Sequence, residues 1–223
     1  MKKFFMLISL VGITLCSCNN ENIYSCDDAI DEWVHDNLSE IRVMSRGTWT
    51  TLEEEVKAPV YRAFTNQQRV DFWAKKLEEV LSLDWNEAEK EHIVSAYNFI
   101  KINPHFLDGY NILSDEEKNK FDLFFYEWIE KGKTELHWGM ELMYGIVASG
   151  NRLIDKQGTL LTTVNQTGSR ATVLSTSESK CNCSKSSDWC TPSNVYCEDA
   201  VCQIVGGCGT FWVSDCNGRC GGI

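Results

Sequence analysis

The sequence predicts a mainly α-helical protein, with an N-terminal bundle of five to seven helices followed by a small, disulfide-rich module of loops and β-structure. Two observations predict this fold class. Apolar residues recur at helical spacing over residues 27–154, and cysteines are dense in residues 181–223. A segment of about forty residues has too few apolar side chains for a core of its own, so covalent bonds or a metal must support it.

The helical domain, residues 27–154, carries separate amphipathic stretches. Helices are expected from Ile30 to Ile41 and from Leu52 to Phe64, the second kinked or split at Pro59. Three further starts have the pattern of a capping box, in which a capping side chain precedes a Glu or Gln by three residues. They are Thr65 with Gln68, Asn86 with Glu89, and Ser114 with Glu117. A last helix is expected from about Glu135 to Ser149, and this domain is long enough to fold without the cysteine-rich module.

The first residues have the pattern of an export signal. Lys2 and Lys3 precede an apolar run, Phe4 to Leu15, that is too short to span a membrane. The stretch Leu15-Cys16-Ser17-Cys18 resembles a bacterial lipobox, which implies cleavage before Cys18 and acylation of that residue. Residues 1–17 are then a lipoprotein signal peptide and residues 18–26 a polar tether; an ordinary secretory signal is the alternative.

Export favours disulfide bonds over free thiols in the C-terminal module, because compartments outside the cytoplasm are oxidising. Zinc is the alternative, but the spacings lack paired C-x-x-C motifs and no histidine is nearby. Eight cysteines allow 105 pairings, and the sequence does not choose among them. The residues expected to form four disulfides are Cys181, Cys183, Cys190, Cys197, Cys202, Cys208, Cys216 and Cys220.

Cys26 leaves the number of cysteines odd once Cys18 is acylated. Cys26 is therefore unpaired, bonded to another molecule, or bonded to a tail cysteine that leaves another one unpaired. The sequence places no histidine beside it as a base, so we expect an inert or intermolecular role.

Residues 155–180 are rich in Ser, Thr and Gly and are expected to form a linker. A short hairpin between Leu160-Leu161 and Val173-Leu174 would give it some order. Arg170 lies in a Gly-Ser-Arg stretch that suits a protease, which would release the C-terminal module.

Three aromatic residues of the module are candidate binding residues: Trp189, Phe211 and Trp212. In one interpretation they form the miniature core of the disulfide scaffold. In the other they are exposed and contact a surface target, as rigid aromatic side chains often do at interfaces.

The sequence has no motif of a familiar enzyme class, and we expect neither a catalytic residue, a metal site nor a cofactor. The net charge is −11 and becomes −13 when Lys2 and Lys3 leave with the signal. This charge argues against nucleic acid as a partner. Anchorage in the membrane would depend on the lipid on Cys18, because the near-neutral tail is not attracted to anionic lipid.

The stretch Phe64-Thr65-Asn66-Gln67-Gln68, followed by Phe72-Trp73 and by the eight-cysteine tail, resembles the bacteriocin fulvocin C-related proteins. The resemblance implies an exported, cell-envelope protein, in the outer membrane or at the cell surface, whose tail acts as a bacteriocin-like effector on a surface target, with or without release. The alternative is a non-enzymatic lipoprotein that binds a protein or glycan and has no antibacterial activity.

Overall fold

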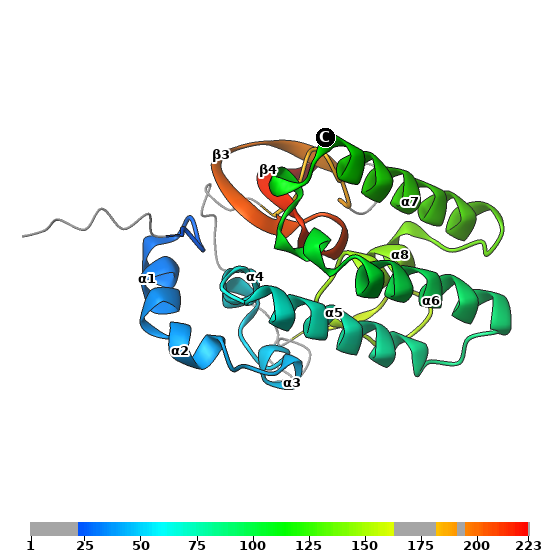
Figure 1. Ribbon diagram of the computed structural model, residues 1–223, viewed down its shortest axis with the longest axis horizontal. Helices are drawn as coiled ribbons and strands as arrows, with labels where there is room; N and C mark the ends of the chain where they lie inside the picture. The colour runs from blue at the N-terminus through cyan, green and yellow to red at the C-terminus, as the bar shows by residue number, and fades with distance from the viewer. Residues whose placement is uncertain (1–21, 163–181, 191–194, 223) are drawn as a thin grey trace, which may run out of the picture.

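The computed structural model describes residues 22–162, 182–190 and 195–222, and it is mainly helical (Figure 1). Three short helices come first, α1 (Asp28–Asp36), α2 (Leu38–Ile41) and α3 (Arg46–Trp49). They are followed by α4 (Glu54–Arg62), α5 (Asn66–Leu81), α6 (Glu87–Ile102), α7 (Asp115–Thr134) and α8 (Met140–Val147). Two 3₁₀ helices, η1 (Pro104–Asp108) and η2 (Tyr110–Ile112), connect α6 to α7. The predicted mainly α fold with a cysteine-rich C-terminal module is confirmed.

The predicted starts of the three long helices are also confirmed. At the start of α5, the Thr65 hydroxyl accepts from the Gln68 N–H, and the Gln68 side chain accepts from the Thr65 N–H. The same reciprocal pairs begin α6 and α7. Each box satisfies two backbone donors that the first helical turn leaves without a partner.

Other helix boundaries differ from the prediction. The first stretch divides at Asn37, whose side-chain amide donates to Trp33 O at 2.8 Å and ends α1. The last predicted helix, from about Glu135 to Ser149, begins later than expected, because His137 has a φ of 56°, in the left-handed region that interrupts a helix. Consequently α7 ends at Thr134 and α8 begins only at Met140. The second stretch is a single helix, and α4 continues through Pro59.

Two antiparallel hairpins complete the fold. β1 (Arg152–Leu153) pairs with β2 (Leu160–Leu161), so Leu160 and Leu161 have their partners upstream in the chain. Val173 and Leu174, their expected partners, lie outside the described residues. β3 (Val195–Cys208) pairs with β4 (Ser214–Gly222), and the 3₁₀ helix η3 (Thr210–Trp212) connects them.

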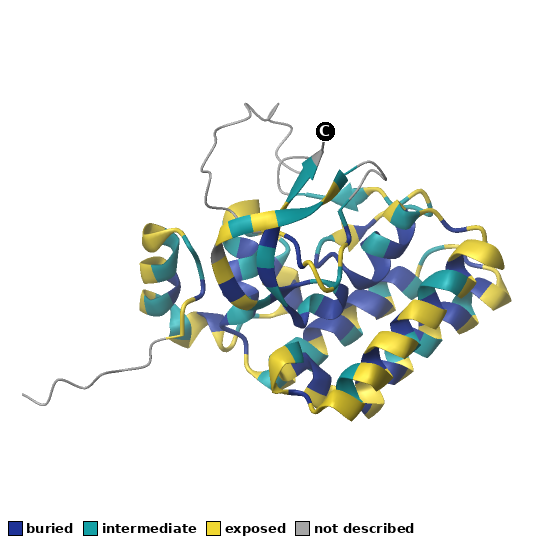
Figure 2. Cartoon of the chain, turned by 90° about the horizontal axis from the view of Figure 1, so that it is seen from above, coloured by how far each residue is buried: buried dark blue, intermediate teal, exposed yellow. Residues whose placement is uncertain are grey.

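The β3–β4 hairpin lies against the helices (Figure 1). β3 contacts α4, and β4 contacts η2. On the helical side, α5 contacts α6, α8 and β1, and α7 contacts α6 and α8. Buried segments of the helices and of the hairpin face each other in the interior, while the outer faces of the long helices are exposed (Figure 2).

The connection between β3 and β4 inserts two aromatic rings among the helices. The Phe211 ring centroid is 4.9 Å from that of Trp73 and 5.3 Å from that of Phe125. The Trp212 centroid is 4.9 Å from Tyr61 and 5.7 Å from Trp49. We call this group the junction cluster; it consists of Trp49, Tyr61, Phe72, Trp73, Phe125, Phe211 and Trp212.

Hydrogen bonds hold the same connection against the helices. The Tyr61 hydroxyl donates to Phe211 O at 3.2 Å and accepts from Trp73 Nε1 at 2.9 Å. Trp212 Nε1 donates to Ala148 O at 2.8 Å, at the end of α8. The Tyr110 N–H donates to Val213 O at 2.8 Å. The polar groups buried with the two rings therefore have partners.

The backbone of the connection is strained. Phe211 and Trp212 have φ values of 49° and 57°, a region that non-glycine residues seldom adopt. Such a conformation costs on the order of 1–3 kcal/mol and persists only where the surroundings enforce it. Here the helices are those surroundings. The strained turn directs both rings into their core, and the packing of the rings holds the turn in this conformation.

The helices and the cysteine-rich module therefore share one core. The continuous cluster of buried apolar residues includes Trp189, Phe211 and Val213 together with residues of α4 to α8. We expected the helical domain to have a core of its own, but in the structure its buried apolar residues form one cluster with those of the module. The boundaries between the units stay a prediction.

Replacement of Phe211 should destabilise the whole protein. Phe211→Ala removes a fully buried ring and leaves a cavity, so we expect the free energy of unfolding to fall by about 3–5 kcal/mol. Urea unfolding followed by tryptophan fluorescence measures this change. Val201→Ala is the control, since Val201 is 99% exposed in the same module. Comparable losses in the two variants would contradict the shared core.

His92 is buried on α6 and has the environment of a structural residue. Its ring stacks on Trp128 at a centroid distance of 4.6 Å, and Nε2 lies 3.0 Å from Trp128 O. Burial lowers the pKa of His92 to about 4, with a smaller lowering from Lys131. The folded protein therefore disfavours the protonated ring.

Acid should destabilise the protein through His92. The pKa of His92 in the folded protein lies below the ordinary value near 6.5, so the contribution of the neutral ring to the free energy of unfolding is fully present above pH 6.5. This contribution is lost as the pH falls towards 4. We expect the free energy of unfolding to decrease by up to about 1.4 kcal/mol per pH unit across this window. Urea unfolding at pH 7 and pH 5 tests this. His92→Gln should reduce the difference between the free energies of unfolding at pH 7 and pH 5, whereas His105→Gln at the surface should leave that difference unchanged. A His92→Gln variant with the pH dependence of the wild type would refute the role of His92.

Candidate functional site

A cavity of about 450 Å³ opens where the helices meet the cysteine-rich module. One wall comes from α4, from the segment that follows α8 and from the residues around the start of α1. The other comes from β3, from β4 and from the residues before and between them. We call it the junction cleft. Side chains from both units line it, including Glu54, Lys57, Tyr144, Asn151, Trp189 and Trp212.

Three polar side chains in the cleft form a closed hydrogen-bonded group. Lys57 Nζ lies 2.6 Å from Glu54 Oε1 and donates to Asn151 Oδ1 at 2.9 Å. Asn151 Nδ2 donates to Glu54 Oε2 at 3.0 Å. Lys57 is only 3% exposed, whereas the Glu54 side chain is 39% exposed. The buried ammonium is thus compensated, and the carboxylate remains accessible from the cleft.

The segment after α8 is fixed by cations from other helices. Arg46 Nη1 donates to Gly150 O at 2.8 Å, and Lys76 Nζ donates to Asn151 O. Burial lowers the pKa of Lys76 well below its ordinary value, with a smaller lowering from Arg46. A Cβ at Gly150 would lie 2.6 Å from the Trp49 ring, so this position requires glycine for close approach.

Arg62, which also lines the cleft, connects three segments of the chain. Its guanidinium donates to Tyr24 O at 2.8 Å and to Gly206 O at 3.1 Å, and Nη2 lies 3.2 Å from Cys216 Sγ. The five donors of a guanidinium suit such multiple contacts. Arg62 therefore joins the N-terminal segment, α4 and the β3–β4 hairpin.

Three disulfides are present among the described side chains of the module. They join Cys183 to Cys197, Cys190 to Cys220, and Cys208 to Cys216. The pairing of Cys181, and the side chain of Cys202, lie outside the described part of the chain. Cys26 is disulfide-bonded as well. The expectation of an intermolecular Cys26 is therefore wrong, because Cys26 is bonded within the chain, whereas an inert role is compatible with a sulfur held in a disulfide.

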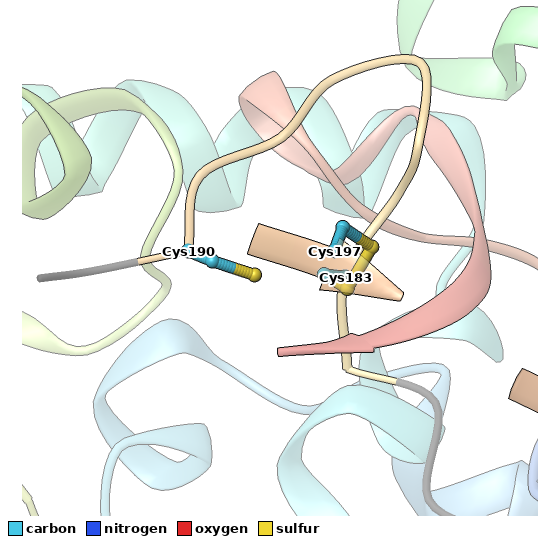
Figure 3. A group of neighbouring side chains, drawn as sticks. All are labelled: Cys183, Cys190 and Cys197. Carbon is cyan, nitrogen blue, oxygen red and sulfur yellow. A yellow bond between two sulfur atoms is a disulfide. The ribbon is translucent and has the colours of Figure 1, made fainter. Parts of the chain in front are cut away.

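The sulfur atoms of Cys183, Cys190 and Cys197 lie within 4.8 Å of one another (Figure 3). Three cysteines at such distances would suit a thiophilic metal if they were thiolates. In this structure each sulfur belongs to a disulfide, which supplies no thiolate ligand.

The predicted binding residues are brought together, but in the interior. Trp189 is 7% exposed, and its Nε1 donates to Thr210 Oγ1 at 3.0 Å. Phe211 is fully buried and Trp212 is half-buried in the junction cluster. The hypothesis of an exposed contact patch is wrong for Phe211, because its ring fills space between helices. Trp189 and Trp212 are among the residues that line the cleft.

Residues that sequence reasoning missed include Lys57, Arg62 and Asn151. Glu54 and Lys57 lie three residues apart on one helix, a spacing at which side chains meet. That spacing was a usable signal for two of the three members of the polar group. Asn151 lies 94 residues from Lys57 in the chain, so the local sequence around either residue does not indicate their contact.

Cys18 and Arg170, the predicted lipidation and cleavage positions, lie outside the described residues. Within the described ranges, no helix combines the length and the apolar character needed to cross a bilayer.

A second hollow, of about 690 Å³, lies among α3, α5 and α6. It is bordered by surface ion pairs such as Lys75–Glu78, whose side chains are 66% and 50% exposed. None of the described residues of the cysteine-rich module belongs to its lining. We therefore take the junction cleft as the candidate site, because it alone of the two combines polar groups from both units.

The fold and the cleft define a helical protein completed by a disulfide-bonded hairpin that shares its core. Comparison with known proteins adds no relative: no family model, no curated protein and no solved structure matches this chain. The resemblance to fulvocin C-related proteins stays a prediction from the sequence.

Loss of the buried ammonium in the cleft should be more costly than loss of a surface one. Lys57→Met leaves Asn151 Oδ1 without its donor, so we expect a loss of about 1–3 kcal/mol in the free energy of unfolding. Lys75→Met on α5 is the matched control, with an expected change within about 0.5 kcal/mol because its ion pair is exposed. Urea unfolding compares the two. Equal free energies of unfolding for the two variants would show that the group of Glu54, Lys57 and Asn151 does not contribute to stability.

Proposed function

We propose that this protein is an exported lipoprotein, anchored in the cell envelope through a lipid on Cys18, that binds a surface glycan through the junction cleft. The charged start, the apolar run and the lipobox-like stretch before Cys18 support the anchor. Binding needs neither a cofactor nor covalent chemistry with the glycan.

The observation that carries this proposal is the shared core. Both walls of the cleft are held in place by the junction cluster, so the cleft exists only in the intact chain. A released tail would lose the helical wall and expose the rings of Phe211 and Trp212 to water. This gives more support to an intact binding protein than to a detached bacteriocin-like effector.

The chemistry of the lining favours a polar, hydroxyl-rich ligand. The cleft offers the carboxylates of Glu54 and Glu55 and the amides of Asn151 and Asn182, which can hydrogen-bond sugar hydroxyls. Tyr144 and Trp212 add aromatic surface to the wall. Its volume lies within the range of small-ligand sites, about 300–1,000 Å³. The negative net charge favours neutral over anionic glycans.

Binding of the oxidised protein to an array of neutral oligosaccharides tests the proposal. For the best array ligand, calorimetry should show a loss of about tenfold in affinity for Tyr144→Phe, which removes one hydroxyl, and for Glu55→Ala. Tyr126→Phe and Glu87→Ala, at exposed positions outside the cleft, are the matched controls and should bind like the wild type.

Two results would overturn the proposal. One is a protein that binds no neutral oligosaccharide on the array. The other is growth inhibition of related bacteria by the isolated, oxidised tail (residues 181–223), which would restore the bacteriocin-like alternative.

A further inference from the structure

Four cysteines of the module form a compact group, which we call the sulfur quartet: Cys183, Cys190, Cys197 and Cys220. In the structure they are joined by two disulfides, Cys183–Cys197 and Cys190–Cys220. In Figure 3 the Cys190 sulfur points towards the Cys183–Cys197 pair, and the three sulfurs lie within 4.8 Å of one another.

The positions of these cysteines also fit a second pairing. Cys197 and Cys220 lie directly opposite each other in the β3–β4 ladder. Opposite residues of an antiparallel pair have Cα atoms about 4.5–5.5 Å apart, which lies within the range that a disulfide bridges. The remaining two, Cys183 and Cys190, already have neighbouring sulfurs. Cys183–Cys190 with Cys197–Cys220 is thus accessible without moving the hairpin.

One carboxylate holds the two disulfides together. Asp188 Oδ1 accepts from the Cys190 N–H at 2.8 Å, and Oδ2 accepts from the Cys197 N–H at 2.9 Å. These two cysteines belong to different disulfides. Asn182 Oδ1 accepts from the Cys220 N–H at 2.9 Å and fixes the fourth member.

An external thiol can reach the quartet. Cys190, Cys197 and Cys220 are partly exposed, and Cys190 and Cys220 line the junction cleft. The third disulfide differs, since Cys208 is 5% exposed and Cys216 is fully buried. Exposed disulfides are the ones that exchange most readily.

We propose that the sulfur quartet is a thiol–disulfide exchange site, which reacts with a thiol in the cleft and alternates between two disulfide pairings. This activity is separate from glycan binding and goes beyond it.

The exchange is balanced at each step. An incoming thiolate attacks Cys220 Sγ, forms a mixed disulfide with it and releases the Cys190 thiolate. The Cys190 thiolate attacks Cys183 Sγ, forms Cys183–Cys190 and releases the Cys197 thiolate. The Cys197 thiolate attacks Cys220 Sγ, forms Cys197–Cys220 and expels the original thiolate. No electrons are gained or lost overall, and the mixed disulfide is a covalent complex with the thiol compound.

Mass spectrometry of the oxidised wild-type protein, incubated with reduced glutathione at mildly alkaline pH and then acid-quenched, tests the exchange. Cleavage after Lys185, Tyr196, Trp212 and Arg219 places the four cysteines on separate peptides and separates Cys208 from Cys216, and fragmentation of each linked pair identifies the bonded cysteines. We expect linked peptides that contain Cys183–Cys190 and Cys197–Cys220 beside the original pairs. Cys208–Cys216 is the internal control and should keep its pairing. Persistence of only the original pairs, or scrambling that includes Cys208–Cys216, would overturn the proposal.

A pair of variants gives a second measurement without added thiol. Cys220→Ser leaves a thiol on Cys190 beside an intact disulfide, so alkylation should label Cys183 or Cys197 as well as Cys190. Cys208→Ser leaves a thiol on buried Cys216, and the label should remain there. A label confined to Cys190 in the first variant, with circular dichroism showing native helix content, would refute exchange within the quartet.

Discussion

Insertion of the Phe211 and Trp212 rings between helices is the interaction on which the rest of this structure depends. Burial of an aromatic side chain contributes about 1.5–3 kcal/mol, and favourable ring pairs add about 0.5–1.5 kcal/mol each. The left-handed backbone at the two residues costs on the order of 1–3 kcal/mol per residue. Burial, ring contacts and the hydrogen bonds of Tyr61 and Trp212 together offset that strain. The turn keeps its conformation because the helices surround it.

The two halves of the protein therefore stabilise each other by different means. Disulfides restrict the unfolded module, and the helices supply the apolar surroundings that the module lacks. In return the module fills space that would otherwise be a cavity beside Trp73. Arg62 extends this dependence to the N-terminal segment, because its guanidinium donates to Tyr24 O and to Gly206 O. The junction cleft results from the same arrangement, because its two walls are fixed by a common core.

Local structure could be predicted from the sequence, and long-range packing could not. The capping boxes at Thr65, Asn86 and Ser114 are local signals, since both partners lie within one helical turn. Phe211 could equally have been exposed or buried, because its contacts with Trp73 and Phe125 join segments far apart in the chain. The same holds for the junction cleft: the Glu54–Lys57 spacing could be recognised in the sequence, and the contact between Lys57 and Asn151 could not. Cysteine number predicted disulfides without predicting the pairing that brings the sulfur quartet together.

The order of the helices and the strained turn along the chain has a consequence for folding during synthesis. Because synthesis proceeds from the N-terminus, the helices emerge before Phe211, so the groove beside Trp73 stays hydrated until the turn follows. The Cys208–Cys216 disulfide closes around the turn, and its sequence separation of eight residues is the shortest of the three. Such a loop has the smallest closure entropy and can form early. A nearly finished bundle thus has an open aromatic groove, which Phe211 fills once the connection between β3 and β4 has been made.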